Sequence, residues 1–455
     1  MSLTLARYIQ IFDQAVKNED SQALLNCVSI HPISQDGPQQ SEFNEPNDFD
    51  LYYIDEKFRP VIRSHLKLMK SVYKQKNIET SFQDLNELVN HMIRAGDQQT
   101  NWINRPLIKI MNELIAVYKI KQQKYPEDMS SFEFQDELGE SSINGYDKTS
   151  SLEQLANTIN KGFKLSLNDK NLELSKSKRI DIYYLLANLI RIYFKMNKLE
   201  LAKSLEKALL GARFQLPNPT TTIINKKYSI IYLYYSSLLL LDEGEFLKSE
   251  QKLITCYQIL TNYSDNINLN LNQLKKILLL LLPLRLYNHG KYPKTDSDIW
   301  ERFPDLNLIY KQNLFKSIIE GNIYQFNQSI SKFETIFLNH HLYLLIELLR
   351  QQCYLNLFRK TYKIIELESN ESEDTTKQSQ PHIVPINAFQ LAYEYSLNSQ
   401  SEKQQQLQDQ PRIFQTSLDE IECLLATLIT NGKVKGYLSH SNRCIVLSKN
   451  NPFPR

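Results

Sequence analysis

The chain has 455 residues, of which 42% are hydrophobic, so it is long enough for two or three domains or for one extended array of repeats. Lys and Arg number 53 against 51 Asp and Glu, and the formal net charge of +2 excludes a global electrostatic field that would steer a partner. Glycine occurs only 11 times, which argues against all-β and doubly wound folds and favours a mostly α-helical protein.

The chain shows no sign of export or of membrane insertion. At the N-terminus, apolar residues between Leu3 and Val16 are interrupted by polar ones, which is typical of an amphipathic helix and not of a signal peptide. The longest apolar runs, 238–241 and 277–282, are far too short to span a bilayer, so no membrane partner is expected. The five cysteines are Cys27, Cys256, Cys353, Cys423 and Cys444. They are widely spaced and mostly lie in apolar surroundings, which favours buried, reduced thiols in the nucleus or cytosol.

Four stretches are rich in polar, acidic or proline residues and are expected to be loops or insertions. They are residues 30–50, 122–151, 366–381 and 398–411. Residues 366–381 contain five acidic residues and no aromatic one, so they cannot bury enough surface to offset the entropy of ordering. Residues 1–150 are expected to be helical with loops, but they contain no motif.

Between these stretches, the spacing of apolar residues predicts pairs of helices. The predicted helices are 177–194, 199–210, 226–241, 245–260, 269–285, 309–319, 323–338 and 342–362. Two of the second helices begin alike, with LAKS at 201–204 and LKS at 247–249, a weak repetition typical of stacked helix pairs. Their many Tyr and Phe residues are expected to pack between helices and not to stack on bases. An all-α repeat, or α-solenoid, is therefore predicted over 177–340.

Residues 416–455 predict one helix followed by a small β-hairpin. Ser417 and Glu420 have the spacing of a capping box, in which side chains satisfy two free amides at a helix start. Apolar residues then recur at helical spacing as far as Leu428, and Asn431-Gly432 marks the end of the helix.

Two short runs rich in β-forming residues follow that helix, at 434–438 and 444–447, and a turn-prone segment at 439–442 separates them. A second helix is predicted upstream at 385–397. A helix that leads into a hairpin after earlier helices is the outline of a winged helix, which is therefore predicted over 341–455.

The hairpin region is strongly basic. Residues 431–455 contain no acidic residue, so Lys433, Lys435, Arg443 and Lys449 are candidate nucleic-acid-binding residues, because neutralised phosphates release counterions. A solvated basic face or a protein-binding module would have the same composition. His440 in the turn is suited to phosphate contact when it is protonated, although a local hydrogen bond is the simpler interpretation.

The sequence contains no recognisable catalytic motif. No GxG spacing, HExxH, GxSxG or pair of cysteine couples is present, so phosphate loops, common hydrolase sites and zinc sites are not predicted. The adjacent His340 and His341 would point about 100° apart on a helix, which suits joint metal binding poorly. We expect no enzymatic activity, no cofactor and no metal.

Several segments resemble one branch of the PCI-domain family. KGYLSH at 435–440 and LSKNNPFP at 447–454 resemble its C-terminal signature, and Gly321-Asn322 and residues 354–362 are also similar to it. The branch includes subunit twelve of the COP nine signalosome and PCI-domain protein two, and the similarity covers about 180–455. The resemblance implies an α-solenoid followed by a winged helix.

The resemblance also implies partners and functions. A member of this branch is a scaffold that assembles with a second PCI-domain protein and a small acidic subunit of the Sem-one or DSS-one type. One implied function is membership of a signalosome-type complex, whose other subunits include the catalyst of cullin deneddylation. The other is a TREX-two-like adaptor that binds RNA or DNA during messenger-RNA export or splicing. The fold would place Arg359, Lys360 and Lys363 near the wing, so they join the candidate site, and the expected location is nucleus and cytoplasm.

A third alternative is that the two insertions at 366–381 and 398–411 direct the domain to a different, lineage-specific partner. Both insertions depart from the compact pattern of the family. They would enlarge loops of the winged helix without breaking its core, because the entropy of loop closure grows slowly with length.

Overall fold

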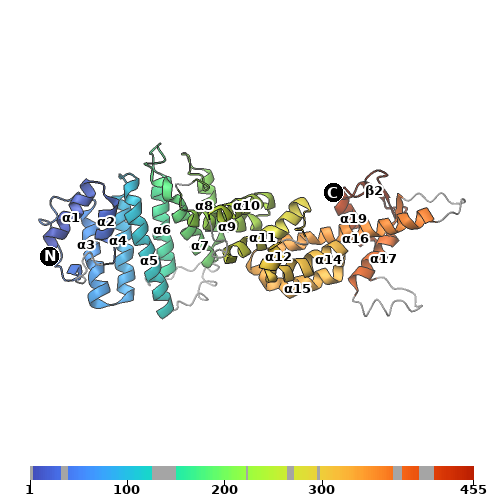
Figure 1. Cartoon of the computed structure of the whole chain (residues 1–455), viewed down its shortest axis with the longest axis horizontal. Coiled ribbons are helices and arrows are strands. Elements are labelled where there is room, and N and C mark those ends of the chain that lie inside the picture. Colours follow the sequence, from blue (N-terminus) through green and yellow to red (C-terminus); the bar gives the residue numbers. More distant parts are fainter. Residues whose placement is uncertain are drawn as a thin grey trace, which may run out of the picture. The chain divides into compact units, whose positions relative to one another are not determined.

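The fold was analysed in a computed structural model (Figure 1). The structure describes residues 4–31, 39–125, 150–221, 224–263, 271–294, 298–371, 382–398 and 415–454. The chain divides into two compact units, Met1–Leu239 and Leu240–Arg455. The domain boundaries predicted near residues 150 and 340 stay predictions. No described helix is both long enough and apolar enough to cross a membrane.

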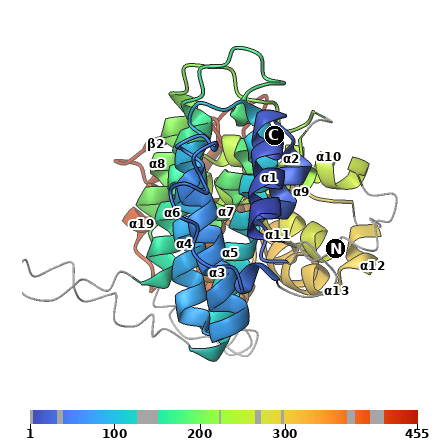
Figure 2. The ribbon, with the colours of Figure 1, turned by 90° about the vertical axis from the view of Figure 1, so that its left-hand side faces the viewer.

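The first unit begins with helices that pack on their neighbours in the chain. They are α1 Leu5–Lys17, α2 Ser21–Val28, α3 Arg59–Met69, α4 Ile78–Ala95 and α5 Asn104–Lys124. Helix α1 buries Tyr8, Phe12 and Ala15 along one face, which confirms the predicted amphipathic helix. Figures 1 and 2 both show α3, α4 and α5 side by side.

Four further helices follow: α6 Ser151–Leu167, α7 Ile182–Lys195, α8 Leu199–Leu210 and α9 Lys226–Asp242. Helices α7, α8 and α9 lie at the predicted 177–194, 199–210 and 226–241, whereas the sequence did not predict α6. Tyrosines join α7 to α9: the ring centroids of Tyr183 and Tyr232 lie 5.3 Å apart, and those of Tyr184 and Tyr228 lie 4.9 Å apart. Tyr183, Tyr184 and Tyr232 are buried and Tyr228 is half-buried, so the expectation that these rings pack between helices is confirmed.

Two buried cations hold the corner before α7, where the 3-10 helix η5 spans Lys178–Asp181. Lys178 is only 2% exposed, and its Nζ donates to the carbonyls of Gly96, Asp97 and Gln99 at 3.0, 3.0 and 2.8 Å. These carbonyls lie at and after the C-terminal end of α4, where the helix supplies no amide donors for them. The neighbouring Arg179 is equally buried and lies over the ring of Phe214, 4.9 Å from its centroid. Both side chains therefore stabilise the fold.

A buried histidine joins α3 to the first two helices. His65 is fully buried, and its Nε2 donates to the Ser29 carbonyl at 3.1 Å. Its Nδ1 can then only accept, and it receives the hydroxyl of Tyr8 at 2.9 Å. Burial lowers the pKa of His65 from 6.5 to about 4, so the ring is neutral at physiological pH.

The second unit begins with a helical array of its own. Its helices are α10 Phe246–Tyr263, α11 Leu271–His289, α12 Asp298–Arg302, α13 Pro304–Leu306, α14 Lys316–Glu320, α15 Ile323–Asn339 and α16 Tyr343–Glu371, with the π-helix η7 Asn307–Phe315 before α14. Helix α11 continues past Pro283 to His289, beyond its predicted end. Helix α16 continues to Glu371, into the predicted insertion 366–381, because glutamate is a good helix former. Residues 372–381 and 399–411 lie outside the described residues.

Gly321 explains one of the sequence motifs. It follows α14 with a φ of +68°, in the left-handed region that favours glycine. A Cβ atom there would lie 2.8 Å from the backbone of Leu357 in α16. The next residue, Asn322, caps α15 by accepting the amide of Gln325. Gly321-Asn322 therefore sets the close approach of α14 to α16 and the start of α15.

The C-terminal elements form a winged helix against α16 (Figure 1). They are β1 Ile383–Pro385, α17 Ile386–Leu397, α19 Leu418–Thr430, β2 Gly436–Ser439 and β3 Cys444–Leu447. The strands pair antiparallel in the order β1-β3-β2. The predicted solenoid followed by a winged helix with a small hairpin is confirmed, and β1 is an element that the sequence did not predict. The predicted N-cap is also present, since Ser417 Oγ accepts the amide of Glu420 at 3.2 Å.

One wall of the winged helix is α16 itself. The ring of Phe358 packs edge-on against Phe389 of α17 at 5.2 Å, and Tyr354 contacts Tyr393 at 5.8 Å. On another side of the same stretch of helix, Asn356 donates to the Ile318 carbonyl of α14 at 2.8 Å. The helical array and the winged helix therefore share one helix as a common wall.

Candidate nucleic-acid interface

The β2–β3 hairpin has two ends, and the candidate cations are divided between them. We define the open end as residues 433–435 and 448–454, and the turn end as residues 440–443. At the open end, the Lys435 amide donates to the Pro452 carbonyl at 2.8 Å, and the Ser448 amide donates to the Lys435 carbonyl at 2.9 Å. These bonds fix the segment after β3 beside the residues that precede β2.

Three predicted site residues gather at the open end. Lys433, Lys435 and Lys449 are exposed, and none of them forms an ion pair with a residue that the structure describes. Gly436 permits this arrangement, because a Cβ atom there would overlap the Val446 carbonyl of β3. The open end therefore presents three cations without an internal counter-charge among the described residues.

The segment after β3 also brings the open end to α16. The ring of Phe453 lies 5.7 Å from that of Tyr362, and the Arg359 guanidinium lies 5.8 Å from the centroid of Phe453. This contact places Arg359 beside the open end, as the family resemblance implied. Sequence reasoning did not identify Phe453 as the link, although it belongs to the PFP motif of the C-terminal signature.

The remaining two cations of α16 differ from each other. The Nζ of Lys360 donates to the Glu320 carbonyl at 3.0 Å, so this side chain stabilises the C-terminal end of α14. Lys363 is exposed and lies one turn after Arg359 on the same face of the helix. Arg359 and Lys363 therefore extend the basic surface, whereas Lys360 already has a structural role.

At the turn end, positive charge is balanced by α19. Arg443 donates to Asp419, and to Glu422 at 3.0 Å, and His440 Nδ1 lies 2.9 Å from Glu422. The hydrogen bond to Asp419 raises the pKa of Arg443 above its usual value. The absence of acidic residues from 431–455 suggests that the positive charge of the hairpin is uncompensated. This is wrong at the turn end, because carboxylates of α19, a helix outside residues 431–455, pair with the hairpin. The hydrogen bond expected for His440 is present, but its partner is on α19.

The acidic start of α19 also limits how the wing can meet a nucleic acid. Asp419 and Glu420 are exposed in the first turn, where negative charge is favoured by the helix dipole. A helix that reads bases in a groove would bring these carboxylates close to phosphates, which would repel them. The charge distribution therefore favours contact with the sugar-phosphate backbone through the open end.

The turn end also contains a set of groups with metal-ligand geometry. Ligand atoms of Asp419, Glu422 and His440 lie within 4.8 Å of one another. However, Arg443 donates to both carboxylates, so its guanidinium already supplies the positive charge that a metal ion would bring. We treat the group as an ion-pair cluster.

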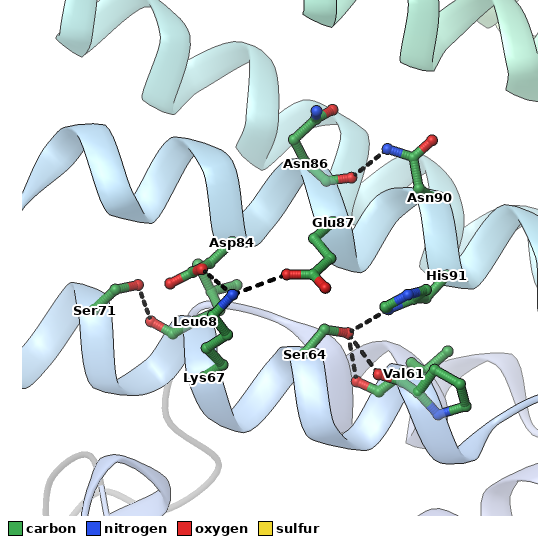
Figure 3. A network of polar contacts seen from close by, with 11 residues as sticks. Val61, Ser64, Lys67, Leu68, Ser71, Asp84, Asn86, Glu87, Asn90 and His91 are labelled. Atoms are coloured by element: carbon green, nitrogen blue, oxygen red, sulfur yellow. Dashed lines mark hydrogen bonds and ion pairs between the residues drawn. The ribbon is translucent and has the colours of Figure 1, made fainter.

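A polar network between α3 and α4 contains a Ser–His pair, but its geometry is structural (Figure 3). His91 Nδ1 lies 3.2 Å from Ser64 Oγ, and Ser64 donates its own proton to the Pro60 carbonyl at 2.8 Å. The hydroxyl is buried and its proton is already bonded to the helix, so it is not activated as a nucleophile. In the same network, Lys67 Nζ lies 3.0 Å from both Asp84 and Glu87 and ties the two helices together.

The adjacent histidines after α15, His340 and His341, have different environments. His341 Nδ1 lies 2.9 Å from Asp242, and burial lowers the pKa of the half-buried His340. His341 has a φ of +56°, so the pair does not lie on a regular helix. His341 is therefore part of an ion pair with Asp242 and does not share a ligand with His340.

Comparison with known proteins decides the family. Residues 399–449 match the PCI domain. A protein named CSN12 homolog from Debaryomyces hansenii is 50% identical over 455 residues, which is 100% of this chain and 99% of that protein. The chain belongs to the PCI-domain family. Within the family it belongs to the branch that contains the CSN12 homologues and PCI domain-containing protein 2.

More distant relatives of the same branch agree with this placement. Cop9 signalosome complex subunit 12 of Saccharomyces cerevisiae is 28% identical over 403 residues, covering 85% of this chain and 84% of that protein. PCI domain-containing protein 2 of Xenopus laevis is 25% identical over 309 residues, covering 67% of this chain and 64% of that protein. One relative in this branch, the Saccharomyces cerevisiae protein, is thus named as a subunit of the Cop9 signalosome complex.

Proposed function

We propose that this PCI-domain protein is a non-catalytic scaffold subunit that binds the phosphate backbone of RNA through the open end of its wing. The observation that carries the proposal is the group of three exposed lysines, Lys433, Lys435 and Lys449, which form no ion pair with any described residue. Arg359 and Lys363 extend the same surface. Lysines of this kind contact phosphates as point charges and provide little sequence preference. A scaffold with this role in messenger-RNA export or splicing would work in the nucleus and the cytoplasm.

The test is charge reversal at the open end. The full-length variant Lys433→Glu/Lys435→Glu/Lys449→Glu should bind single-stranded RNA at least about tenfold more weakly, and the slope of log affinity against log salt should fall by about 2. A matched control is Lys164→Glu/Lys170→Glu/Lys207→Glu, which makes the same change of net charge at exposed lysines of the first unit. An open-end variant with the affinity and salt slope of the control would refute the proposed surface.

Similarity to Cop9 signalosome complex subunit 12 of Saccharomyces cerevisiae supports a second candidate function. In this alternative, the chain is a scaffold in a signalosome-type complex in which a partner subunit catalyses cullin deneddylation. A second PCI-domain protein and a small acidic Sem-one or DSS-one type subunit are proposed partners in both functions. Edge strands β1 and β2 offer backbone groups for lateral assembly with another PCI protein.

Affinity purification of the tagged protein, with and without nuclease, separates the two functions. Recovery of signalosome subunits in both samples would support the deneddylation scaffold. Nuclease-sensitive recovery of splicing or export factors, together with a second PCI protein, would support the RNA-binding adaptor.

A further inference from the structure

A short loop before α3 exposes three aromatic rings. Phe49 is 91% exposed, Tyr52 70% and Tyr53 82%. The rings of Tyr52 and Tyr53 lie 5.5 Å apart and nearly perpendicular to each other. Single exposed apolar side chains are common on proteins, but three large rings within five consecutive residues make a patch that needs a function.

The loop that carries these rings is held firmly. Leu51, between the exposed rings, and Ile54, directly after them, are buried at 0% and 3% exposure and anchor the loop to the core. Arg59 of α3 donates to the carbonyls of Tyr52 and Ile54 at 3.1 and 3.0 Å. The backbone is closed by a hydrogen bond from the Ile54 amide to the Leu51 carbonyl at 3.1 Å. The rings are therefore presented on an ordered backbone, which reduces the entropy cost of binding a partner.

The segment that carries the rings is acidic. Residues 42–56 contain no lysine or arginine, and their acidic residues are Glu42, Glu45, Asp48, Asp50, Asp55 and Glu56. All six are exposed. Asp48 pairs with Arg63, and the other five form no ion pair with any residue described in the structure. We refer to residues 42–56 as the acidic aromatic loop.

We propose that the acidic aromatic loop binds an arginine-containing segment of a partner protein. A guanidinium group can stack on the face of a tyrosine or phenylalanine ring while it donates paired hydrogen bonds to a carboxylate. Lysine has no planar group to stack and is more strongly hydrated, so it fits this combination less well. Nucleic acid does not fit, because the carboxylates would repel phosphates. The loop lies far along the chain from the wing, so the inference does not depend on RNA binding at the open end.

Fluorescence anisotropy with the full-length protein and labelled peptides tests the inference. The peptides contain repeated Arg-Gly-Ser, Lys-Gly-Ser, Leu-Gly-Ser or Glu-Gly-Ser units. We expect the arginine peptide to bind most tightly, the lysine peptide more weakly and the glutamate peptide not at all. The variant Phe49→Ser/Tyr52→Ser/Tyr53→Ser should weaken binding of the arginine peptide by about tenfold, since each ring contributes a fraction of the binding energy. Its melting temperature should stay unchanged, because the rings are exposed.

Matched variants distinguish the contribution of the rings to peptide binding from that of the carboxylates. Tyr53→Ser should weaken peptide binding, whereas Tyr125→Ser, at a tyrosine 64% exposed in the same unit, should not. Glu42→Gln/Glu45→Gln/Glu56→Gln should reduce both the affinity and its dependence on salt. The open-end variant Lys433→Glu/Lys435→Glu/Lys449→Glu should bind the arginine peptide normally. Unchanged binding by the triple-serine variant, or equal binding of the leucine and arginine peptides, would overturn the inference.

Discussion

Lysines in two regions of this protein show how differently the same residue type is used. At the corner before α7, Lys178 is 2% exposed and donates to three backbone carbonyls. At the open end of the wing, Lys435 is exposed and forms no ion pair with a described residue. The first lysine satisfies polar groups that would otherwise be buried without partners, whereas the second leaves its charge available to another molecule. The role of a cation is therefore set by what surrounds it in the fold.

The largest effect should come from the buried corner. Replacing Lys178 with Met removes the donor from three carbonyls that follow α4, and we expect the free energy of unfolding to fall by about 3 kcal/mol. Urea denaturation of the full-length protein measures this change. The matched control is Lys176→Met two residues earlier, an exposed lysine whose ion pair is with the exposed Glu173, and the stability of this variant should match that of the wild type. Equal stabilities for the two variants would remove the distinction between the regions.

The buried histidine of the first unit should make stability depend on pH. The folded-state pKa of His65 lies at about 4 and its unfolded value at about 6.5, so the unfolded chain takes up the proton first as the pH falls. The neutral His65 ring stabilises the folded state fully above about pH 6.5. We expect the free energy of unfolding to fall by about 2 kcal/mol between about pH 7 and pH 5. His65→Gln should flatten this part of the pH profile. An equally steep pH profile in His65→Gln and in the wild type would contradict this prediction.

The turn end of the hairpin can be converted to resemble the open end. Asp419→Asn/Glu422→Gln removes the carboxylates that pair with Arg443 and His440. We expect RNA affinity to rise severalfold, because the wing then carries an additional free cation and less negative charge. The melting temperature should fall only modestly, since the Asp419 and Arg443 side chains are 69% and 39% exposed, although that of Glu422 is 15% exposed. An unchanged RNA affinity would show that the turn end lies outside the RNA-binding surface.

The smallest effect on stability should come from the open end itself. Lys433→Gln/Lys435→Gln/Lys449→Gln removes three exposed charges that no described residue pairs, so the free energy of unfolding should stay within about 0.5 kcal/mol of the wild type. Urea denaturation checks this expectation. A loss of several kcal/mol would mean that these lysines stabilise the fold in the way Lys178 does.

The sequence predicted the architecture well where a signal is local. The predicted helix at 199–210 has its observed bounds, and Ser417 is the predicted cap of α19. Both predictions depend on residues that are close in the sequence, which is why they succeed. Strand β1 was missed because only three residues, Ile383–Pro385, form it, and its partner β3 lies about sixty residues later in the chain. A strand so short has no alternation of its own to detect.

The candidate site was predicted only in part, because several of its contacts join elements that are distant in the chain. The basic residues of the hairpin were visible in the sequence, but the pairing of Arg443 with Asp419 depends on how α19 packs beside the turn. The carbonyl contact of Lys360 and the link through Phe453 also join elements that are distant in the chain. The exposed rings of Phe49, Tyr52 and Tyr53 could not be told from core residues, because exposure is a property of the folded chain.

The shared helix α16 gives the second unit a mechanical property. One stretch of this helix packs on α14 through Asn356 and on α17 through Phe358, so no loop lies between the helical array and the winged helix at this contact. Hinges in proteins are usually loop residues or element ends, which can absorb changes in backbone angle. A continuous helix instead works as a lever: a partner that tilts the array by pushing on α14 would carry the wing, and the cations at its open end, through the same rotation.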